Sequence, residues 1–372
     1  MADPEHGMSN RRSFLVSGTA TAATLACTGG DSGYAAAVQD VRRPLPVRLQ
    51  VGGFPLYELV RYATLAPSSH NTQCWIFKLG EGSITILPDM LRRCPAVDPD
   101  DHHLYVSLGC AAENLVQDAL AVGLHAEVAF QEASGAIQVD LTATRAVQTP
   151  LFETIPLRQS TRAEYDGRAV SAGDLRLLEQ AGTGQGVRPL LFTSRPQTEA
   201  ILEYVARGNT LQIGDPAFVA ELGSWMRFNA HDALTAGDGL FSAASGNPTL
   251  PHWLGSRLMP FFMTAGHEND KYAKQVRSSS GMAVFVSDAN DKAHWVEVGR
   301  CYERFALQAT ALGMRNAMLN QPVEVAELRP QFAAYLGIGT RRPDLVVRFG
   351  YGVAMLQSLR RPVDAVIQPG RV

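Results

Sequence analysis

Two stretches of the sequence, GCAAENLVQDALAVGL at 109–124 and GRCYERFALQATALGM at 299–314, match each other at a constant offset of 190 residues. Their apolar residues fall on the same helical stripe, and each has a glycine near its end that suits a helix C-terminus. The coincident residues are Gly109 and Gly299, Glu113 and Glu303, Ala119 and Ala309, Ala121 and Ala311, and Gly123 and Gly313. The pattern therefore predicts two equivalent helices.

The strand-like run before each helix also matches. ITILPD at 84–89 resembles AVFVSD at 283–288, and each run ends in aspartate. Two amphipathic helices can look alike by chance, but a matching strand before each one favours an internal duplication. We therefore expect an α+β fold with two pseudo-symmetric halves, at about 45–150 and 151–372.

Hydrophobic periodicity divides the first half into helices and strands. In chain order we expect a helix at 56–63, strands at 75–79 and 84–87, a helix at 107–122, and strands at 125–130 and 136–141. The first two strands are close enough in sequence to pair with each other.

The second half is longer than the first, and the excess lies at about 200–280, after the strand-like VRPLLF at 187–192. This region contains FNAHDALTAGDGLFSAASGNPTLPHWLG, which is rich in Gly, Ser, Asn and Pro. Long insertions of this kind are usually functional or mobile. We expect a lid over a cleft shared by the two halves; an excursion over the surface is the alternative.

The first 37 residues differ from the rest of the chain. Arg11 and Arg12 precede an apolar segment without charge up to Asp31, and the small residues at 35–37 offer a cleavage site. This order is typical of a secretory signal, and the arginine pair indicates the twin-arginine variant. Cys27 loosely resembles a lipoprotein acceptor, and a disordered tail with a chance arginine pair is the alternative. We expect residues 1–37 to be a signal peptide for the twin-arginine export machinery, which implies a periplasmic or other extracytoplasmic location.

Composition excludes several classes of protein. The formal net charge is −3 and no basic block follows the N-terminus, so we expect no nucleic-acid partner. The apolar segment of the leader is too short to span a bilayer stably. The later cysteines lack the paired spacing of a disulfide framework or a zinc site: Cys74, Cys94, Cys110 and Cys301. We therefore expect no metal site.

His102 and His103 are candidate metal ligands. They lie close in sequence to Asp98, Asp100 and Asp101. Imidazole and carboxylate groups can share a cation. A run of charges between two elements is more often a solvated turn, and we prefer that interpretation.

Two polar segments can carry chemistry. LAPSSHNTQCWIF at 65–77 places hydroxyl, imidazole and amide groups between a helix and a strand, and LRQSTR at 157–162 contains two arginines. In an extended segment Arg158, Ser160 and Arg162 point the same way. Two forked donors and a hydroxyl suit a phosphate group, although a solvated basic face is the alternative.

Together these segments resemble the nitroreductase family of FMN-dependent oxidoreductases. The family has an R-x-S-x-R segment, matched by residues 158–162, and a P-S-x-x-N-x-Q-P-W segment, matched by residues 67–75 with Cys74 in place of proline. It ends with R-x-G and R-R-P, matched at 348–350 and 360–362. The resemblance implies an FMN cofactor and a small-molecule substrate and electron donor.

The resemblance also implies residue roles. Arg158, Ser160 and Arg162 are expected to bind the FMN phosphate, with either Arg360 or Arg361 nearby. The expected contacts of the flavin ring or ribityl chain are Pro67, Ser68, Ser69, Asn71 and Gln73, with Asn320 and Gln321 near the reactive edge. The flavin carries the redox chemistry, so no catalytic side chain is named. Cys74 is expected to pack inward as a small apolar residue, with a contact to the cofactor as the alternative.

The distribution of the motifs departs from an ordinary family member, which carries both motifs in each chain of a dimer. Here the first half has only the PSSHN turn, and the second has only RQSTR and the C-terminal RRP. This resembles the Acg branch, in which fused halves form an internal pseudo-dimer. We expect one complete FMN site and a monomer.

Three functions remain open at this level. The first is an exported FMN oxidoreductase with a flavin redox cycle, and the second is a flavin-sequestering or storage protein with little turnover. The third is a degenerate scaffold that binds no flavin.

Overall fold

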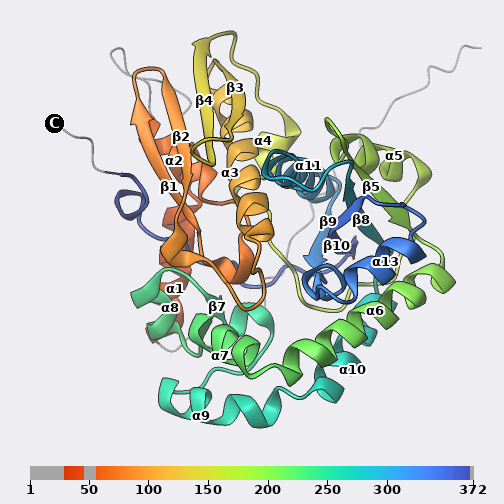
Figure 1. Cartoon of the computed structure of the whole chain (residues 1–372). Helices are drawn as coiled ribbons and strands as arrows, with labels where there is room; N and C mark the ends of the chain where they lie inside the picture. Colours follow the sequence, from red (N-terminus) through yellow and green to blue (C-terminus); the bar gives the residue numbers. More distant parts are fainter. Residues whose placement is uncertain (1–28, 46–55, 369–372) are drawn as a thin grey trace, which may run out of the picture.

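The computed structural model describes residues 29–45 and 56–368, which contain two four-stranded antiparallel sheets on either side of a central helix pair (Figure 1). The strands of the first sheet, in the order β1-β2-β4-β3, are β1 (Trp75–Gly80), β2 (Ser83–Pro88), β4 (Ala136–Ala143) and β3 (Leu124–Gln131). Strands β1 and β2 form a hairpin with Gly80 opposite Ser83. The four strands predicted for the first half are therefore confirmed, whereas the long helix predicted at 107–122 spans His102–Ala121.

The second sheet has an equivalent order, β5-β8-β10-β9. Its strands are β5 (Val187–Phe192), β8 (Gly281–Ser287), β10 (Arg342–Tyr351) and β9 (Met314–Met318). All seven residues of β8 are buried, as expected for a strand covered on both faces. In both sheets the strands follow the order first, second, fourth, third, and a long helix joins the second strand to the third. This is the arrangement that an internal duplication predicts.

The two long helices, α3 (His102–Ala121) and α11 (Lys292–Ala311), cross at the repeated glycines. A Cβ on Gly109 would lie 2.0 Å from the carbonyl oxygen of Val296, and a Cβ on Gly299 would lie 2.0 Å from that of Val106. Only glycine permits so close a backbone approach. The contact is reciprocal, so equivalent positions of the two halves meet at one point.

Buried carboxylates flank this crossing. Glu113 accepts hydrogen bonds from Arg304 at 2.8 Å and Arg300 at 3.3 Å, and its repeat partner Glu303 forms an ion pair with Arg158 at 3.2 Å. Removing one member of such a buried pair leaves an uncompensated charge, which is strongly destabilising. The matched glutamates are thus part of the packing between the central helices.

Shorter helices complete the two halves. They are α2 (Leu56–Ala63), η1 (Ser69–Asn71), η2 (Met90–Arg92), α4 (Pro150–Thr154), α5 (Ala172–Ala181), α12 (Gln321–Glu324), α13 (Arg329–Tyr335) and η4 (Val363–Ala365). Helix α2 buries Leu59, Val60 and Ala63, together with Arg61 and Tyr62. It packs on α3 and ends beside the PSSHN turn.

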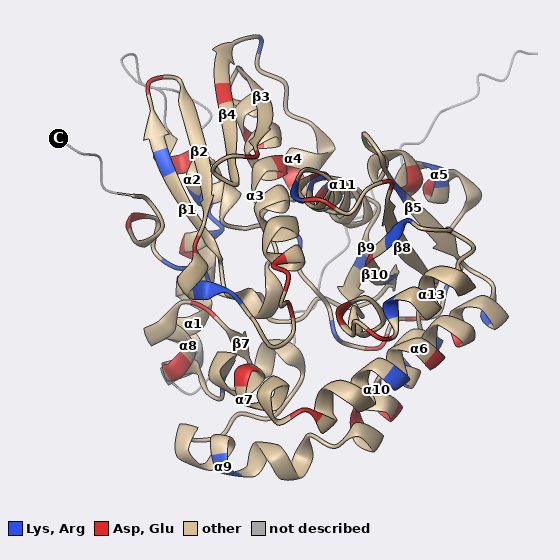
Figure 2. Cartoon of the chain, viewed as in Figure 1, with Lys and Arg blue, Asp and Glu red and all other residues tan. Residues whose placement is uncertain are grey.

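The insertion lies between β5 and β8 and is largely helical. Its elements are α6 (Arg195–Gly214), α7 (Pro216–Trp225), β6 (Met226–Arg227), α8 (Ala230–Ala236), β7 (Leu240–Phe241), η3 (Ala243–Ser245), α9 (His252–Phe262) and α10 (Ala265–Arg277). Figure 1 shows these elements along one side of the molecule, below both sheets. Helices α6 and α10 each carry both acidic and basic residues (Figure 2).

The first described helix, α1 (Gly29–Val41), packs on α8 of the insertion. Its Tyr34 is buried, and the hydroxyl donates to the carbonyl of Gln357 at 2.8 Å. Residues 1–28 of the expected signal peptide lie outside the described residues. A cut at residues 35–37 would divide α1, so the position of cleavage stays a prediction.

No helix within the described residues is both long and apolar enough to cross a membrane.

The glycine crossing yields a stability prediction. Gly109→Ala and Gly299→Ala should each lower the free energy of unfolding by about 1–3 kcal/mol or more, because the new methyl group overpacks the helix backbone. Urea denaturation followed by circular dichroism measures this loss.

Gly266→Ala in α10 is the matched control, since no atom lies within 4 Å of the position a Cβ would take. It should be neutral or stabilise the protein by about 0.5–1 kcal/mol, the usual gain of alanine over glycine in a helix. Equal stability losses at all three positions would contradict the crossing.

Candidate functional site

The turn after α2 has a strained backbone at the PSSHN motif. His70, Asn71 and Gln73 have φ angles of 48°, 55° and 53°, in the left-handed region that non-glycine residues rarely adopt. Ser68 stabilises the turn because its Oγ accepts a hydrogen bond from the Gln73 amide at 2.9 Å. Such conformations persist only where the surrounding structure holds them, and they concentrate at functional sites.

Two arginines from the second half hold the end of α2. Arg360 donates to the carbonyls of Thr64, Leu65 and Ala66, and Arg158 donates to Leu65 O at 3.1 Å. Carbonyls at a helix C-terminus lack intrahelical partners and favour positive charge. The structure thereby brings together the PSSHN turn, the RQSTR segment and the C-terminal RRP.

A third arginine joins this pair from the N-terminal side. We call Arg42, Arg158 and Arg360 the arginine group; all three are at most 8% exposed. Arg42 donates to the carbonyl of Pro156 at 2.9 Å and to that of Arg158 at 3.3 Å. Within the described parts of the chain, Glu303 is the carboxylate that forms an ion pair with the group, 3.2 Å from Arg158 Nε.

The arginine group carries more positive charge than its surroundings neutralise. Burial, reinforced by repulsion from Arg158, lowers the pKa of Arg360 to about 9, and burial raises the pKa of Glu303 to about 7. Arg158 Nη1 and Arg42 Nε are buried and have no hydrogen-bond partner among the described residues. Because unpaired buried donors are costly, this site is suited to an anionic group.

The two arginines of RQSTR have different surroundings. Arg158 is 2% exposed, whereas Arg162 is open to solvent, and Ser160 between them is half-buried in a bridge to Asn316. The two guanidinium groups thus differ in burial, and the expectation that they share one face with the hydroxyl stays a prediction. A joint role in phosphate binding stays a prediction.

Arg348, from the R-x-G motif, fixes the segment that follows. It donates to the carbonyls of Thr161 and Ala163, both at 2.8 Å, and its guanidinium lies 4.1 Å from the centre of the Tyr165 ring. Gln275 of α10 donates to the Arg162 carbonyl. The RQSTR segment is thus held by the second sheet on one side and by the insertion on the other.

The amide side chains of the PSSHN turn have protein partners. Asn71 donates to Gly239 O at 3.1 Å and accepts from Arg360 Nη1 at 3.1 Å. Gln73 donates to Gly237 O at 2.9 Å and accepts from the Arg361 amide at 2.8 Å. These amides tie the insertion and the C-terminal segment to the turn, so direct contact with a flavin stays a prediction.

The remaining expected site residues also differ in whether their side chains have protein hydrogen-bond partners. Asn320 Oδ1 accepts from the Val346 amide at 3.0 Å, whereas the Oε1 of buried Gln321 has no partner among the described residues. The Arg361 guanidinium donates to Ala365 O at 2.7 Å, so Arg360 is the member of the pair whose side chain reaches the turn. Pro67, Ser68 and Ser69 are partly buried.

Cys74 packs inward, as predicted. It is 2% exposed, its Sγ lies 3.9 Å from Leu104 O, and burial raises its thiol pKa to about 12. A thiol that stays protonated is a poor nucleophile. The replacement of the family's proline by cysteine therefore acts through packing.

The interpretation of His102 and His103 as part of a solvated turn is wrong. Both are buried, and Asp98 accepts hydrogen bonds from the amides of His103 and Leu104, both at 3.0 Å. His102 Nε2 lies 2.9 Å from Asp344 Oδ1 on β10. The acidic residue thus caps the start of α3, and the histidines pack where the two halves meet.

Some site residues escaped the sequence analysis. Arg42 and Gln275 lie far from the motifs in sequence, and no local pattern identifies them. The sequence identified Glu303 only as a repeat position, and His70 only as one of the two variable residues of P-S-x-x-N.

The two adjacent C-terminal arginines offer a matched test of the turn's support. Arg360→Lys should lower the free energy of unfolding by about 2 kcal/mol, because one ammonium cannot replace the guanidinium fork at three carbonyls and charged hydrogen bonds contribute about 1.5–3 kcal/mol each. Arg361→Lys, at a partly exposed position, should change it by less than about 0.5 kcal/mol. Thermal and urea unfolding measure both; equal effects would contradict the assignment of Arg360.

Comparisons with known proteins agree with the resemblance of the motifs. No protein-family model matches the chain. The chain is 25% identical over 333 residues to proteins of Mycobacterium tuberculosis strains H37Rv and CDC 1551 that are described provisionally as NAD(P)H nitroreductases; the match covers 85% of this chain and 92% of each relative.

Solved structures with a distant similarity include FMN-bound nitroreductases from Bacteroides fragilis and Desulfitobacterium hafniense. The Bacteroides protein is 16% identical with a TM-score of 0.35, and the match covers 57% of this chain and 95% of that protein. The Desulfitobacterium protein is 13% identical with a TM-score of 0.37, and the match covers 60% of this chain and 100% of that protein. The similarity to the mycobacterial proteins along most of both chains supports a relationship with the nitroreductase family.

Proposed function

We propose that this chain is an exported FMN-binding oxidoreductase of the Acg type, with one cofactor site between two fused halves. The observation that carries the proposal is the hydrogen bond from Arg158 to Leu65 O at 3.1 Å. It places the segment that resembles the family's phosphate motif directly against the segment that resembles its flavin-lining turn. Neither half carries both segments, so the pairing of the halves is what completes the site.

The residues present fit an FMN group. The unpartnered Arg158 Nη1 and Arg42 Nε can donate to a phosphate, and solvent-open Arg162 can approach it from the outside. Gln321 Oε1, buried and without a partner among the described residues, can accept from a ring N–H. FMN, when bound, supplies hydride-transfer chemistry, while the chain's own side chains bind and orient it.

The internal duplication supports a single site in a monomer. The two sheets share one strand order, and α3 and α11 meet at repeat-equivalent glycines. The two halves already cover each other along this contact, as the two chains of a dimer would. One flavin per chain and a monomer in solution follow from this arrangement.

Flavin storage with little turnover is the second candidate, and the contacts of the insertion favour it. Asp238 of the insertion forms an ion pair with Arg92 of the first half, and Glu221 accepts from the amides of Ala96 and Val97 at 2.8 and 3.1 Å. These contacts fasten the insertion to the first half and would slow exchange of a bound molecule. Flavin that stays oxidised with both NADH and NADPH, in folded protein, would favour storage.

The phosphate assignment predicts a difference between FMN and riboflavin, which lacks the phosphate. Deflavinated protein should bind FMN about 100-fold more tightly than riboflavin, and Arg162→Ala should reduce this preference about 10-fold, since a charged hydrogen bond contributes about 1.5–3 kcal/mol. Fluorescence titration measures both affinities. Arg162 is solvent-exposed, so the variant is expected to fold.

Arg176→Ala on α5 is the matched control, because Arg176 is also exposed but lies outside RQSTR. It should keep the full preference for FMN. Equal affinity for FMN and riboflavin in the unaltered protein would contradict phosphate recognition by this chain.

Export is proposed from Arg11 and Arg12 and the apolar segment behind them. Since the twin-arginine signal depends on the arginine pair, Arg11→Lys with Arg12→Lys should leave the protein in the cytoplasmic fraction. Immunoblots of periplasmic and cytoplasmic fractions measure the distribution. Unchanged distribution in the double variant would refute this route.

A further inference from the structure

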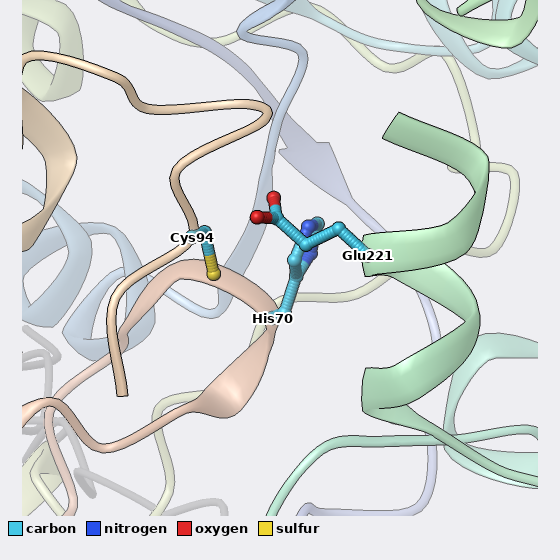
Figure 3. A group of neighbouring side chains, drawn as sticks. All are labelled: His70, Cys94 and Glu221. Atoms are coloured by element: carbon cyan, nitrogen blue, oxygen red, sulfur yellow. The ribbon is translucent and has the colours of Figure 1, made fainter. Parts of the chain in front are cut away.

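Three side chains with metal-binding atoms converge beneath the PSSHN turn. His70 comes from the turn, Cys94 from the loop after η2, and Glu221 from α7 of the insertion (Figure 3). One ligand atom of each lies within 4.8 Å of the other two.

His70 presents an available nitrogen to this group. Its Nε2 is buried and has no hydrogen-bond partner among the described residues, although a buried imidazole nitrogen normally has one. A neutral imidazole binds metals through a ring nitrogen of this kind.

Cys94 and Glu221 are tied to one loop. Cys94 is 4% exposed, and Glu221 accepts hydrogen bonds from the amides of Ala96 and Val97 at 2.8 and 3.1 Å. Each carboxylate oxygen retains a lone pair beyond the one used by an amide. Such outer hydrogen bonds orient a ligating carboxylate in known metal sites.

The charges around the group favour a cation. The carboxylates of Asp98 and Glu324 act electrostatically on Cys94, in addition to that of Glu221 itself. A bound divalent cation would offset that charge and stabilise the thiolate. Nitrogen, sulfur and oxygen ligands in one site are typical of zinc.

We propose that His70, Cys94 and Glu221 form a Zn²⁺ site with three protein ligands and a fourth position open to water. Tetrahedral zinc with zinc–ligand distances of about 2.0–2.3 Å needs ligand atoms roughly 3.3–3.8 Å apart. The three atoms lie within 4.8 Å of one another, so pairs of them would draw together by up to about 1–1.5 Å on binding. Since Glu221 belongs to the insertion and the other two residues to the first half, the ion ties the insertion down over the PSSHN turn.

Metal titration of the full-length, chelator-treated protein tests the site. Zinc, followed by competition with a chromophoric chelator, should bind at about one ion per chain, as one three-ligand cluster implies. Cobalt used in place of zinc should give the strong visible bands of a tetrahedral ion and a thiolate-to-metal charge-transfer band. Flavin content is recorded in parallel, so loss of metal binding is distinguished from loss of flavin.

Single variants identify the ligands. Cys94→Ser and Glu221→Gln should each weaken zinc binding by at least about 100-fold, more than the 10–100-fold typical of losing an outer-shell partner. His70→Asn should do the same, and asparagine tolerates the left-handed backbone at this position. Cys74→Ser, at a buried cysteine outside the group, is the control and should leave zinc affinity unchanged.

Two results would overturn the site. The first is the absence of a thiolate-to-cobalt band in the unaltered protein, which needs no variant to fold. The second is zinc affinity in Cys94→Ser equal to that of the Cys74→Ser control.

Discussion

Helices α3 and α11 touch backbone to backbone at Gly109 and Gly299, and the remaining geometry depends on this contact. Each glycine faces a backbone carbonyl of the other helix: Gly109 faces that of Val296, and Gly299 faces that of Val106. A side chain at either position would push the helices apart. The separation would then move the end of α2 away from Arg158, which reaches it from the other half.

The arginine group, which depends on this packing, forms a candidate anion-binding site. Arg158 and Arg360 neutralise the carbonyl end of α2, but the donors of Arg158 exceed the acceptors offered to them. Burying such groups is costly unless an anion completes their hydrogen bonds. The same residues that stabilise the turn thus also leave capacity for a phosphate, and this dual role explains why the site lies where the halves meet.

Much of the fold was predictable from local patterns. The 190-residue offset identified α3 and α11, and the matching strand runs identified β2 and β8, because helical and strand periodicities depend on nearby residues. The reciprocal contact of Gly109 and Gly299 could not be predicted: the sequence gives two equivalent glycines but not their meeting in space. The presence of the long insertion was predicted from the sequence. Its helices were not predicted, because its Gly- and Asn-rich stretch resembles a loop.

The candidate site was predictable only in part. The motifs located the PSSHN turn and RQSTR, but Asn71 and Gln73 proved to bind backbone groups of the insertion. Arg42 and the cluster of Cys94 with Glu221 depend on tertiary contacts between distant segments. The burial of His102 and His103 was missed because a charged sequence does not reveal that Asp98 caps α3 and faces inward.

The absorption spectrum of the purified full-length protein tests the central claim most directly. The account predicts bound flavin at about one per chain, because one PSSHN turn meets one RQSTR segment, with a band that bleaches on reduction and returns with an electron acceptor. Colourless protein that cannot be reconstituted with FMN would contradict the cofactor site, and a ratio near two would contradict the pairing of complementary halves.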